Sequence, residues 1–301
     1  MIIIIESGGQ LANRMILFSH FIGFCKENNI NLLNPSFTEY AHHFKGTISN
    51  FIPKFPHNKD NKQPNKNTPN KIKNYVIKIF SKLISKIFCN SNYNGKFITS
   101  VNLSAKKYIN KEFELNNTEN IKLLNAAKLT FVNGWLFRDY ENTEKHYETI
   151  KNYFEPLDIY LHHINNFIAN LRKQYDKLIG IHIRRGDYRN YENGKFYYEY
   201  EVYIDCIKQL KNIFNDCNII FILFSNEKID TGLYKKEGLN ITIGHGNFIE
   251  DLYSLAKCDY IIGPPSTYSL WASYYGKVPH RFIQSKNENL KIEDFKVITT
   301  L

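Results

Sequence analysis

A strand-like segment of the chain ends in a group of charged side chains. Residues 179–185 read IGIHIRR, and Gly186 and Asp187 follow. In an extended chain alternate side chains point to opposite faces, so the isoleucines share one face while His182 and Arg184 share the other. An arginine stays charged, and its planar guanidinium donates paired hydrogen bonds to an anion. The pattern predicts a site for a phosphate-bearing ligand at the end of a strand.

A second polar group lies where another strand passes into a helix. Residues 259–276 read DYIIGPPSTYSLWASYYG, and the hydroxyls of Ser266 and Thr267 stand at the helix start. Hydroxyls and the unpaired N–H groups of a helix N-terminus bind phosphate well. Each group also has a structural interpretation, either an N-cap before a core-facing helix or an ion-pair network at a strand end. Together the two groups favour a nucleoside diphosphate as the ligand.

The sequence lacks the motifs of several common phosphate-binding proteins. It has no Walker A motif, no GxGxxG and no DxD pair, which is the usual metal–diphosphate device of one large class of sugar transferases. Its paired histidines, His42–His43 and His162–His163, are sequence neighbours, which do not converge on one ion without distortion. We therefore expect no metal, so that arginine and helix N-termini neutralise the diphosphate.

The net charge of +10 is concentrated in one segment. Residues from Lys45 to Lys86 include ten lysines and one acid, Asp60, and so supply +9 of the +10. The remainder is close to neutral, which argues against nucleic-acid binding by the whole fold. No apolar run reaches the ~18 residues of a membrane-spanning helix, and the five cysteines form no CxxC pair. We expect a cytoplasmic protein with free thiols.

Apolar strands alternate with helices along most of the chain, which is typical of parallel sheets covered on both faces. We expect an α/β fold of two Rossmann-like domains with parallel sheets facing a cleft, formed by residues 1–155 and 156–301. The Lys- and Asn-rich residues 53–70 are expected to be a flexible surface insert. Strands are expected at 2–5, 30–35, 129–133, 178–185, 218–225, 239–244, 259–263 and 280–284, and helices at 11–29, 74–88, 144–154, 158–175, 202–214, 247–258 and 266–276.

Several segments resemble one enzyme family, in the same order along the chain. HIRRGDY at 182–188 resembles the HxRRGDY motif of the α-1,2-fucosyltransferases of glycosyltransferase family 11, which α-1,6- and protein O-fucosyltransferases share more loosely. GGQLANRM at 8–15 is similar to the family's GGxLGNQM, and FILFSNEKID at 221–230 to its FSDD segment. Residues 250–272 resemble the stretch that ends NSTFSWWGA. The resemblance covers the first 45 residues and most of 178–275, and it does not extend to residues 50–130.

The resemblance implies a GT-B fold and an inverting, metal-independent transfer of L-fucose from GDP-fucose to a glycan hydroxyl, without a cofactor. It implies an α-1,2 linkage in surface polysaccharide synthesis, with an acceptor-side N-terminal domain and a C-terminal domain that binds the GDP-sugar. The acceptor would be a glycan or a lipid-linked oligosaccharide. The residues implied around the donor are Arg184 at the β-phosphate with His182 and Arg185 beside it, Asp251 at the guanine edge, Ser225 and Asn226 near the nucleoside, Thr267 and Ser269 at phosphate oxygens, and Asn13 facing the sugar and acceptor.

Four positions depart from the family pattern. Ala12 and Arg14 replace its usual Gly and Gln, and Pro265 and Leu270 replace an Asn and a Trp. Arg14, Pro265 and Leu270 stand near the implied donor or acceptor positions. A transferase of the same fold that uses another GDP-sugar is therefore an alternative, as is a GDP-sugar-binding protein without catalysis.

An inverting transfer also requires a base near the acceptor hydroxyl. Asp187 is the carboxylate nearest in sequence to the arginine clamp. It could instead be a structural partner of Arg185 or Arg14, and Glu192 and Glu199 are other candidates for the base.

The Lys-rich segment allows two interpretations. Lys78, Lys82 and Lys86 are four residues apart, and Ile79, Phe80, Leu83 and Ile87 occupy other positions of the same predicted helix. Either the helix packs its apolar side on the N-terminal domain, or it contacts an anionic membrane surface, as an adaptor or peripheral protein would.

Overall fold

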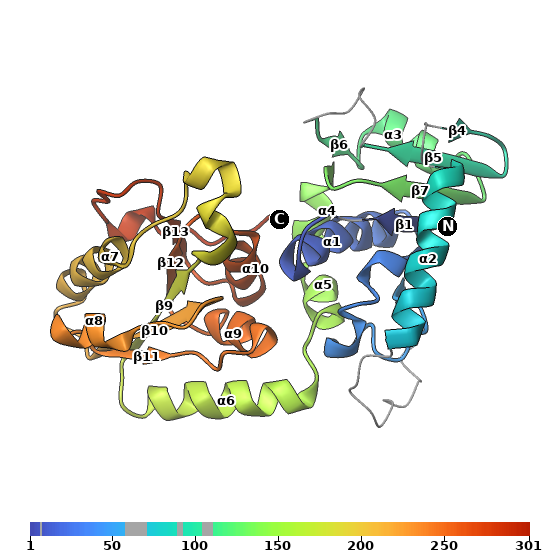
Figure 1. Ribbon diagram of the computed structural model, residues 1–301. Helices are drawn as coiled ribbons and strands as arrows, with labels where there is room; N and C mark the ends of the chain where they lie inside the picture. Colours follow the sequence, from blue (N-terminus) through green and yellow to red (C-terminus); the bar gives the residue numbers. More distant parts are fainter. Residues whose placement is uncertain (7, 58–70, 89–92, 104–110) are drawn as a thin grey trace. The chain divides into compact units, whose positions relative to one another are not determined.

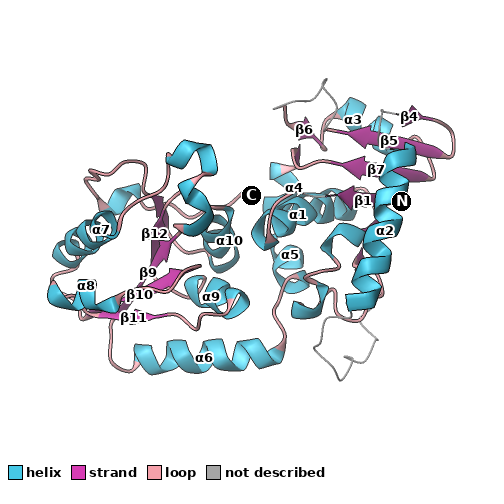
Figure 2. Cartoon of the chain, in the orientation of Figure 1, coloured by secondary structure: helices cyan, strands magenta, loops and turns pink. Residues whose placement is uncertain are grey.

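The computed structural model describes residues 1–6, 8–57, 71–88, 93–103 and 111–301. The chain forms two compact units, an N-terminal unit of Met1–Leu157 with Thr300–Leu301 and a C-terminal unit of Asp158–Thr299. Each unit combines strands with helices (Figure 1, Figure 2). Most of the predicted insert, residues 58–70, lies outside the described residues. Its beginning is not a loop, because Lys54–Phe55 forms strand β3.

The sheet of the N-terminal unit has the strand order β3-β2-β1-β7-β5-β4. Its four inner strands run parallel, while β3 and β4 pair antiparallel at the two edges. The parallel arrangement predicted from the sequence therefore holds for the inner strands, and short antiparallel strands close the edges. The strands are β1 Ile2–Glu6, β2 Leu32–Leu33, β4 Tyr93–Asn94, β5 Ile98–Asn102 and β7 Leu129–Asn133, and a separate pair is formed by β6 Phe113–Glu114 and β8 Phe137–Arg138.

The helices of this unit begin with α1, Leu11–Glu27, which is buried along most of its length. A tight turn precedes α1, where Gly9 has a φ of +78° that L side chains rarely adopt. The predicted helix at 144–154 is divided at His146 into two helices. The remaining elements are η1 Pro35–Phe37, η2 Ala41–His43, α2 Lys71–Phe88, α3 Thr118–Asn125, α4 Tyr140–Lys145 and α5 Tyr147–Tyr153.

The C-terminal unit contains a fully parallel sheet with the order β11-β10-β9-β12-β13. Its strands are β9 Lys177–Ile183, β10 Ile219–Ser225, β11 Ile241–Ile243, β12 Tyr260–Gly263 and β13 His280–Phe282. The helices are α6 Asp158–Arg172, α7 Tyr200–Ile213, α8 Thr231–Lys236, α9 Phe248–Leu255 and α10 Thr267–Gly276, with short turns η4 Gly186–Arg189, η5 Tyr191–Gly194 and η6 Ile292–Asp294.

Helices cover both faces of this sheet, as the near-continuous apolar strands predict (Figure 1). Ile179, Ile181 and Ile183 belong to a core that includes side chains of α7. On the other face a side chain at Gly180 would collide with Leu255 of α9, so the sheet and helix approach closely there. The predicted alternation along β9 is confirmed, and it directs His182 away from the isoleucine core.

The strand order creates a switch point at the central strand. From β9 the chain adds β10 and β11 on one side, and it then crosses to add β12 and β13 on the other. Ligands of open α/β sheets bind outside the carboxyl ends of the strands at such a point. The carboxyl ends of β9, β10 and β12 are therefore where the C-terminal unit is expected to bind a ligand.

Within the described ranges, no helix has the length and apolar character needed to cross a bilayer. The cysteines at 25, 206, 217 and 258 are free thiols, whereas Cys89 lies outside the described residues.

Candidate functional site

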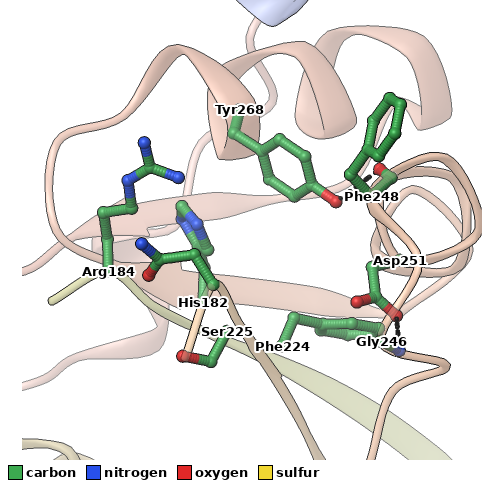
Figure 3. A pocket seen from close by; sticks show the side chains of 9 residues that line it. His182, Arg184, Phe224, Ser225, Gly246, Phe248, Asp251 and Tyr268 are labelled. Atoms are coloured by element: carbon green, nitrogen blue, oxygen red, sulfur yellow. Dashed lines mark hydrogen bonds between the residues drawn. The ribbon is translucent and has the colours of Figure 1, made fainter. Parts of the chain in front are cut away.

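A cavity of about 220 Å³ lies at the carboxyl ends of β9 and β10. Figure 3 shows Arg184 and Asp251 at opposite ends of it, with aromatic rings between them. Five of the residues singled out in the sequence meet here, and they come from three separate segments of the chain. The lining residues are His182, Arg184, Phe224, Ser225, Asn226, Gly246, Phe248, Asp251 and Tyr268.

Asp251 forms one end of the cavity and is held by the loop that follows β11. Its Oδ1 accepts hydrogen bonds from the backbone N–H groups of His245, at 2.6 Å, and of Gly246, at 3.3 Å. The loop lies so close that a Cβ at Gly244 would stand 2.5 Å from Oδ1. Burial raises the pKa of Asp251 to about 6. The two backbone hydrogen bonds lower the pKa, but their effect is smaller than that of burial. The carboxyl group is therefore ionised at neutral pH, and Oδ2 takes no part in these two bonds.

Aromatic side chains form the middle of the cavity. Tyr268, in the first turn of α10, donates a hydrogen bond to the carbonyl of Phe248 at 2.8 Å and so ties α10 to α9. Its ring stacks on that of His182 with centroids 5.2 Å apart. Phe224 is the partner of His182 across β10 and β9. Flat apolar surfaces of this kind suit a planar heterocyclic base.

His182 stands beneath these rings as a neutral imidazole. Burial, together with the positive charges of Arg184 and His280, lowers the pKa of His182 to about 3. Its Nδ1 is buried and has no hydrogen-bond partner in the part of the chain that the structure describes. A glycine is required beside it, because a Cβ at Gly263 would lie 2.5 Å from the His182 carbonyl oxygen. The imidazole therefore lines the cavity without adding charge.

Arg184 forms the opposite end of the cavity. Its Nη2 lies 2.7 Å from Oδ2 of Asp187, and its guanidinium lies over the Tyr188 ring at 5.6 Å. The Tyr188 hydroxyl donates to the carbonyl of Pro265 at 2.6 Å, which fastens this turn to the start of α10. The sequence left Arg185 and Arg14 open as partners of Asp187, and in the structure the partner is Arg184.

Arg185 points away from the cavity. Its guanidinium pairs with Glu199 at 2.7 Å, donates to the carbonyl of Tyr198 at 3.1 Å, and lies 4.2 Å over the ring of Tyr200. Arg184 thus lines the cavity, whereas Arg185 makes contacts within the protein. Arg185 joins the turn after β9 to the start of α7, and Glu199, one of the candidate bases, is engaged in that contact.

The start of α10 adds hydroxyl groups that are partly engaged in the helix itself. Ser266 is the N-cap residue and accepts from the N–H of Tyr268 at 3.2 Å. Ser269 is fully buried and donates to the Ser266 carbonyl at 3.2 Å. Thr267 is partly exposed at the first helical position. None of these three hydroxyls lines the cavity itself.

Asn13 lies in the N-terminal unit, in the first turn of α1. A side chain at Gly9 would collide with that of Asn13, so the glycine turn and the asparagine are packed together. The next residue, Arg14, is held by the Gly9 carbonyl at 3.1 Å and by Glu39 at 3.2 Å. A cavity of about 490 Å³ in this unit is lined by Arg14, Ser36, Glu39, Tyr75, Lys78 and Lys82, among others.

Sequence reasoning missed four lining residues of the C-terminal cavity, Phe224, Gly246, Phe248 and Tyr268. Three are aromatic, and in a strand or helix such residues more often belong to the core. The available signal was position, since each stands at the end of a strand or in the first turn of a helix. Among the described residues, no group of three or more His, Cys, Asp or Glu is arranged to hold a metal ion.

Comparisons with known proteins identify relatives of this fold. The model of glycosyl transferase family 11 matches residues 83–291, which includes much of the region that the motif resemblance left out and excludes the first 45 residues. No curated protein sequence matches the chain.

Solved structures with 11 to 14% identity share the fold. A mutant of Arabidopsis thaliana FUT1 in complex with GDP aligns with a TM-score of 0.56 and 11% identity over 93% of this chain and 69% of that one. POFUT1 in complex with GDP-fucose aligns with a TM-score of 0.54 and 11% identity over 93% and 96%. The fucosyltransferase NodZ from Bradyrhizobium aligns with a TM-score of 0.50 and 14% identity over 92% of each chain.

The two α/β units with parallel strands have the GT-B class of fold, as these neighbours do. Because the family model matches well over half of the chain, the protein belongs to glycosyl transferase family 11 and is a glycosyltransferase.

Proposed function

We propose that the C-terminal cavity binds the GDP part of GDP-fucose and that the protein transfers L-fucose to a glycan hydroxyl. The observation that carries the proposal is the order of groups along the cavity, in which a carboxylate, a set of aromatic rings and a guanidinium follow one another. A guanine nucleotide presents N–H donors, a flat base and phosphates in the same order. The GDP and GDP-fucose bound by two of the solved neighbours are consistent with this assignment.

Asp251 would select guanine over other bases. The N1–H and 2-amino groups of guanine donate side by side, and a carboxylate accepts both. Adenine presents an acceptor at N1, which an ionised Asp251 would repel. With Oδ1 held by the His245 and Gly246 N–H groups, Oδ2 is the oxygen aimed at this role. Hydrogen bonds to an ionised group contribute about 1.5–3 kcal/mol each.

Arg184 would stabilise the negative charge that develops on GDP as the glycosidic bond breaks. The uncharged His182 adds a hydrogen bond, and the N–H groups and hydroxyls at Ser266 and Thr267 would receive further phosphate oxygens. No metal is needed in this arrangement, because the guanidinium supplies the positive charge.

Asp187 is proposed as the base that takes the proton of the acceptor hydroxyl. In the structure its carboxylate is paired with the guanidinium of Arg184 at 2.7 Å. The arriving diphosphate would compete for the guanidinium and so release the Asp187 carboxylate to contact the acceptor hydroxyl. The donor would then prepare the base before transfer takes place.

The acceptor side of the reaction is assigned to the N-terminal unit, with Asn13 as the residue that faces the sugar. This part of the proposal rests on the resemblance of residues 8–15 to the family motif. The family resemblance as a whole supports an α-1,2 linkage and a glycan or lipid-linked oligosaccharide acceptor in surface polysaccharide synthesis. The cysteine pattern, with no CxxC pair, supports a cytoplasmic location. Another GDP-sugar as donor is the alternative.

Thermal unfolding in the presence of nucleotides tests the donor assignment. A ligand at about a hundred times its Kd stabilises a protein by roughly 2.7 kcal/mol. For a unit of this size, that corresponds to a rise of roughly 5–10 °C in Tm. GDP should produce the rise, whereas ADP and UDP at equal concentration should not. Equal shifts with all three nucleotides would contradict the role of Asp251.

A further inference from the structure

Helix α2 carries a wide apolar surface that the described residues of the N-terminal unit leave exposed. Seven large apolar side chains on this helix are between 43% and 78% exposed. They follow one another at spacings of three and four residues, so they form one continuous stripe. This exposed stripe consists of Ile72, Tyr75, Val76, Ile79, Phe80, Leu83 and Ile87.

The opposite side of α2 is the one that packs on the protein. Ile77 and Ser81 are buried, and Ile84 and Phe88 contact a cluster around Ile5 and Phe131 of the sheet. The rings of Phe88 and Phe131 stack with centroids 5.3 Å apart. The helix therefore has a core-facing side of its own, and the exposed stripe is a second apolar surface. Packing on the N-terminal unit accounts for only one of the two.

A row of lysines borders the exposed stripe. Lys78, Lys82 and Lys86 are exposed and four residues apart, so they lie between the core-facing side and the stripe. The helix as a whole contains five lysines and no acidic residue. Lys78 and Lys82 also line the cavity of about 490 Å³ that reaches Arg14 at the start of α1.

We propose that α2 attaches the protein to the surface of an anionic lipid bilayer. The exposed stripe enters the boundary between headgroups and acyl chains, and the lysine row contacts the anionic headgroups. The cavity beside Lys78 and Lys82 then faces the membrane surface. The attachment is reversible and does not depend on which sugar is transferred.

The charge of the helix favours a bilayer over a second copy of the chain. In a two-fold dimer each partner presents the same surface, so two lysine rows would approach each other with no acidic residue on either helix. An anionic bilayer has negatively charged headgroups for the lysines and, directly beneath them, acyl chains for the apolar stripe. The +9 carried by residues 45–86 is matched by such a surface.

Co-sedimentation with lipid vesicles tests the proposal. The wild-type protein should sediment with vesicles of phosphatidylcholine and phosphatidylglycerol, and it should remain in solution with phosphatidylcholine alone. Added salt should weaken binding steeply, since exposed charges are screened over about 8 Å at physiological ionic strength. Reversal of the lysine row by Lys78→Glu, Lys82→Glu and Lys86→Glu should weaken partitioning at least about 100-fold, because each basic residue contributes about 1 kcal/mol and 1.4 kcal/mol is tenfold.

A second variant tests the apolar component separately. Phe80→Gln, Leu83→Gln and Ile87→Gln keep a good helix former at exposed positions. This variant should bind at least about tenfold more weakly while it retains salt sensitivity. A matched control, Lys235→Glu with Lys236→Glu and Lys291→Glu, makes the same charge change at exposed positions of the C-terminal unit and should bind vesicles as the wild type does. Far-UV circular dichroism spectra and Tm values equal to those of the wild type would show that all three variants are folded.

Three results would overturn the proposal. The first is equal sedimentation of the wild type with neutral and anionic vesicles, or no sedimentation with either. The second is a lysine-row variant that binds no more weakly than the matched control. The third is a stable oligomer of the wild type in solution that dissociates in the Phe80, Leu83 and Ile87 variant, because a second copy would then cover the stripe.

Discussion

Replacement of Asp251 by asparagine should change which base the cavity selects. The amide oxygen of Asn can still accept from the His245 and Gly246 N–H groups, so the loop after β11 should keep its shape. The amide NH₂ would then face the ligand in place of Oδ2. The NH₂ group cannot accept from the N1–H and 2-amino groups of guanine, and its own N–H groups would face these donors.

The loss of affinity for GDP should be large because Asp251 is only 6% exposed, so water replaces little of what is lost. Two hydrogen bonds to an ionised group contribute roughly 3 kcal/mol together, which corresponds to a Kd at least about 100-fold higher. ADP affinity should rise, because the amide NH₂ can donate to N1 of adenine, which the carboxylate repels. Xanthosine diphosphate carries a carbonyl where guanine has its 2-amino group, so it should bind the variant better than the wild type.

Isothermal titration calorimetry with GDP, inosine diphosphate, ADP and xanthosine diphosphate measures all of these effects. Inosine diphosphate lacks the 2-amino group, so Asp251→Asn should reduce the affinity for it less than the affinity for GDP. Asp216→Asn makes the same chemical change at an exposed position of the C-terminal unit and serves as the control. A variant that binds GDP within about threefold of the wild type, a difference of roughly 0.7 kcal/mol, would refute the assignment of Asp251 to guanine.

Three further predictions concern the same cavity. Arg184→Ala should reduce the transfer rate about a hundredfold or more, because one oriented charged donor contributes roughly 2–4 kcal/mol to the transition state. Arg184→Lys should recover little activity, because an ammonium cannot form the paired hydrogen bonds of a guanidinium. An alanine variant with a rate within a few-fold of wild type would refute the placement of Arg184. Asp187→Asn should abolish transfer but change GDP affinity no more than about fivefold. The Asp187 carboxylate is half exposed, and exposed ion pairs such as the one with Arg184 contribute about 0–1 kcal/mol. Loss of GDP binding would instead indicate that Asp187 only positions Arg184. Guanosine, which has no phosphate to titrate, should bind about tenfold more weakly at about pH 5 than at about pH 7, because the pKa of Asp251 is about 6 and protonation removes the acceptor. His182, with a pKa of about 3, stays neutral over this range. The pH dependence of guanosine binding should therefore vanish in Asp251→Asn.

The sequence predicted the C-terminal unit well because its signals are local. The alternation of Ile179, Ile181 and Ile183 gives strand β9 and its buried face, and Gly263 with the two prolines after it marks the end of β12. In a parallel sheet, charged residues directly after such strands gather at one edge. Arg184 could therefore be placed at the ligand site from the strand pattern, whereas Asp251, which lies within α9, was implied only by the family resemblance.

The features that the sequence did not reveal depend on packing between distant segments. Arg184 and Arg185 are adjacent and chemically alike, and only the positions of Glu199 and Tyr200 show that Arg185 points away from the cavity. Tyr268 lines the cavity because its hydroxyl bonds to the Phe248 carbonyl and its ring stacks on His182, and these residues stand 20 and 86 positions away in the chain.

The N-terminal unit gave weaker signals for a different reason. Its edge strands β3 and β4 contain two residues each, too few for an alternation to be read. Helix α2 has apolar residues on two sides, and composition alone cannot decide which side meets the sheet. The contacts of Ile84 and Phe88 with the sheet decide it, and they leave the other stripe exposed.

Turnover of GDP-sugars by the purified protein tests whether this chain transfers fucose from GDP-fucose without a metal. Release of GDP is measured with GDP-fucose, GDP-mannose, UDP-glucose and UDP-galactose, with and without a glycan acceptor, in buffer that contains EDTA. We predict turnover of GDP-fucose that persists in EDTA, increases with a suitable acceptor and falls at least about a hundredfold in Arg184→Ala. Turnover of the UDP-sugars in preference to both GDP-sugars, or a strict requirement for manganese or magnesium, would contradict this prediction.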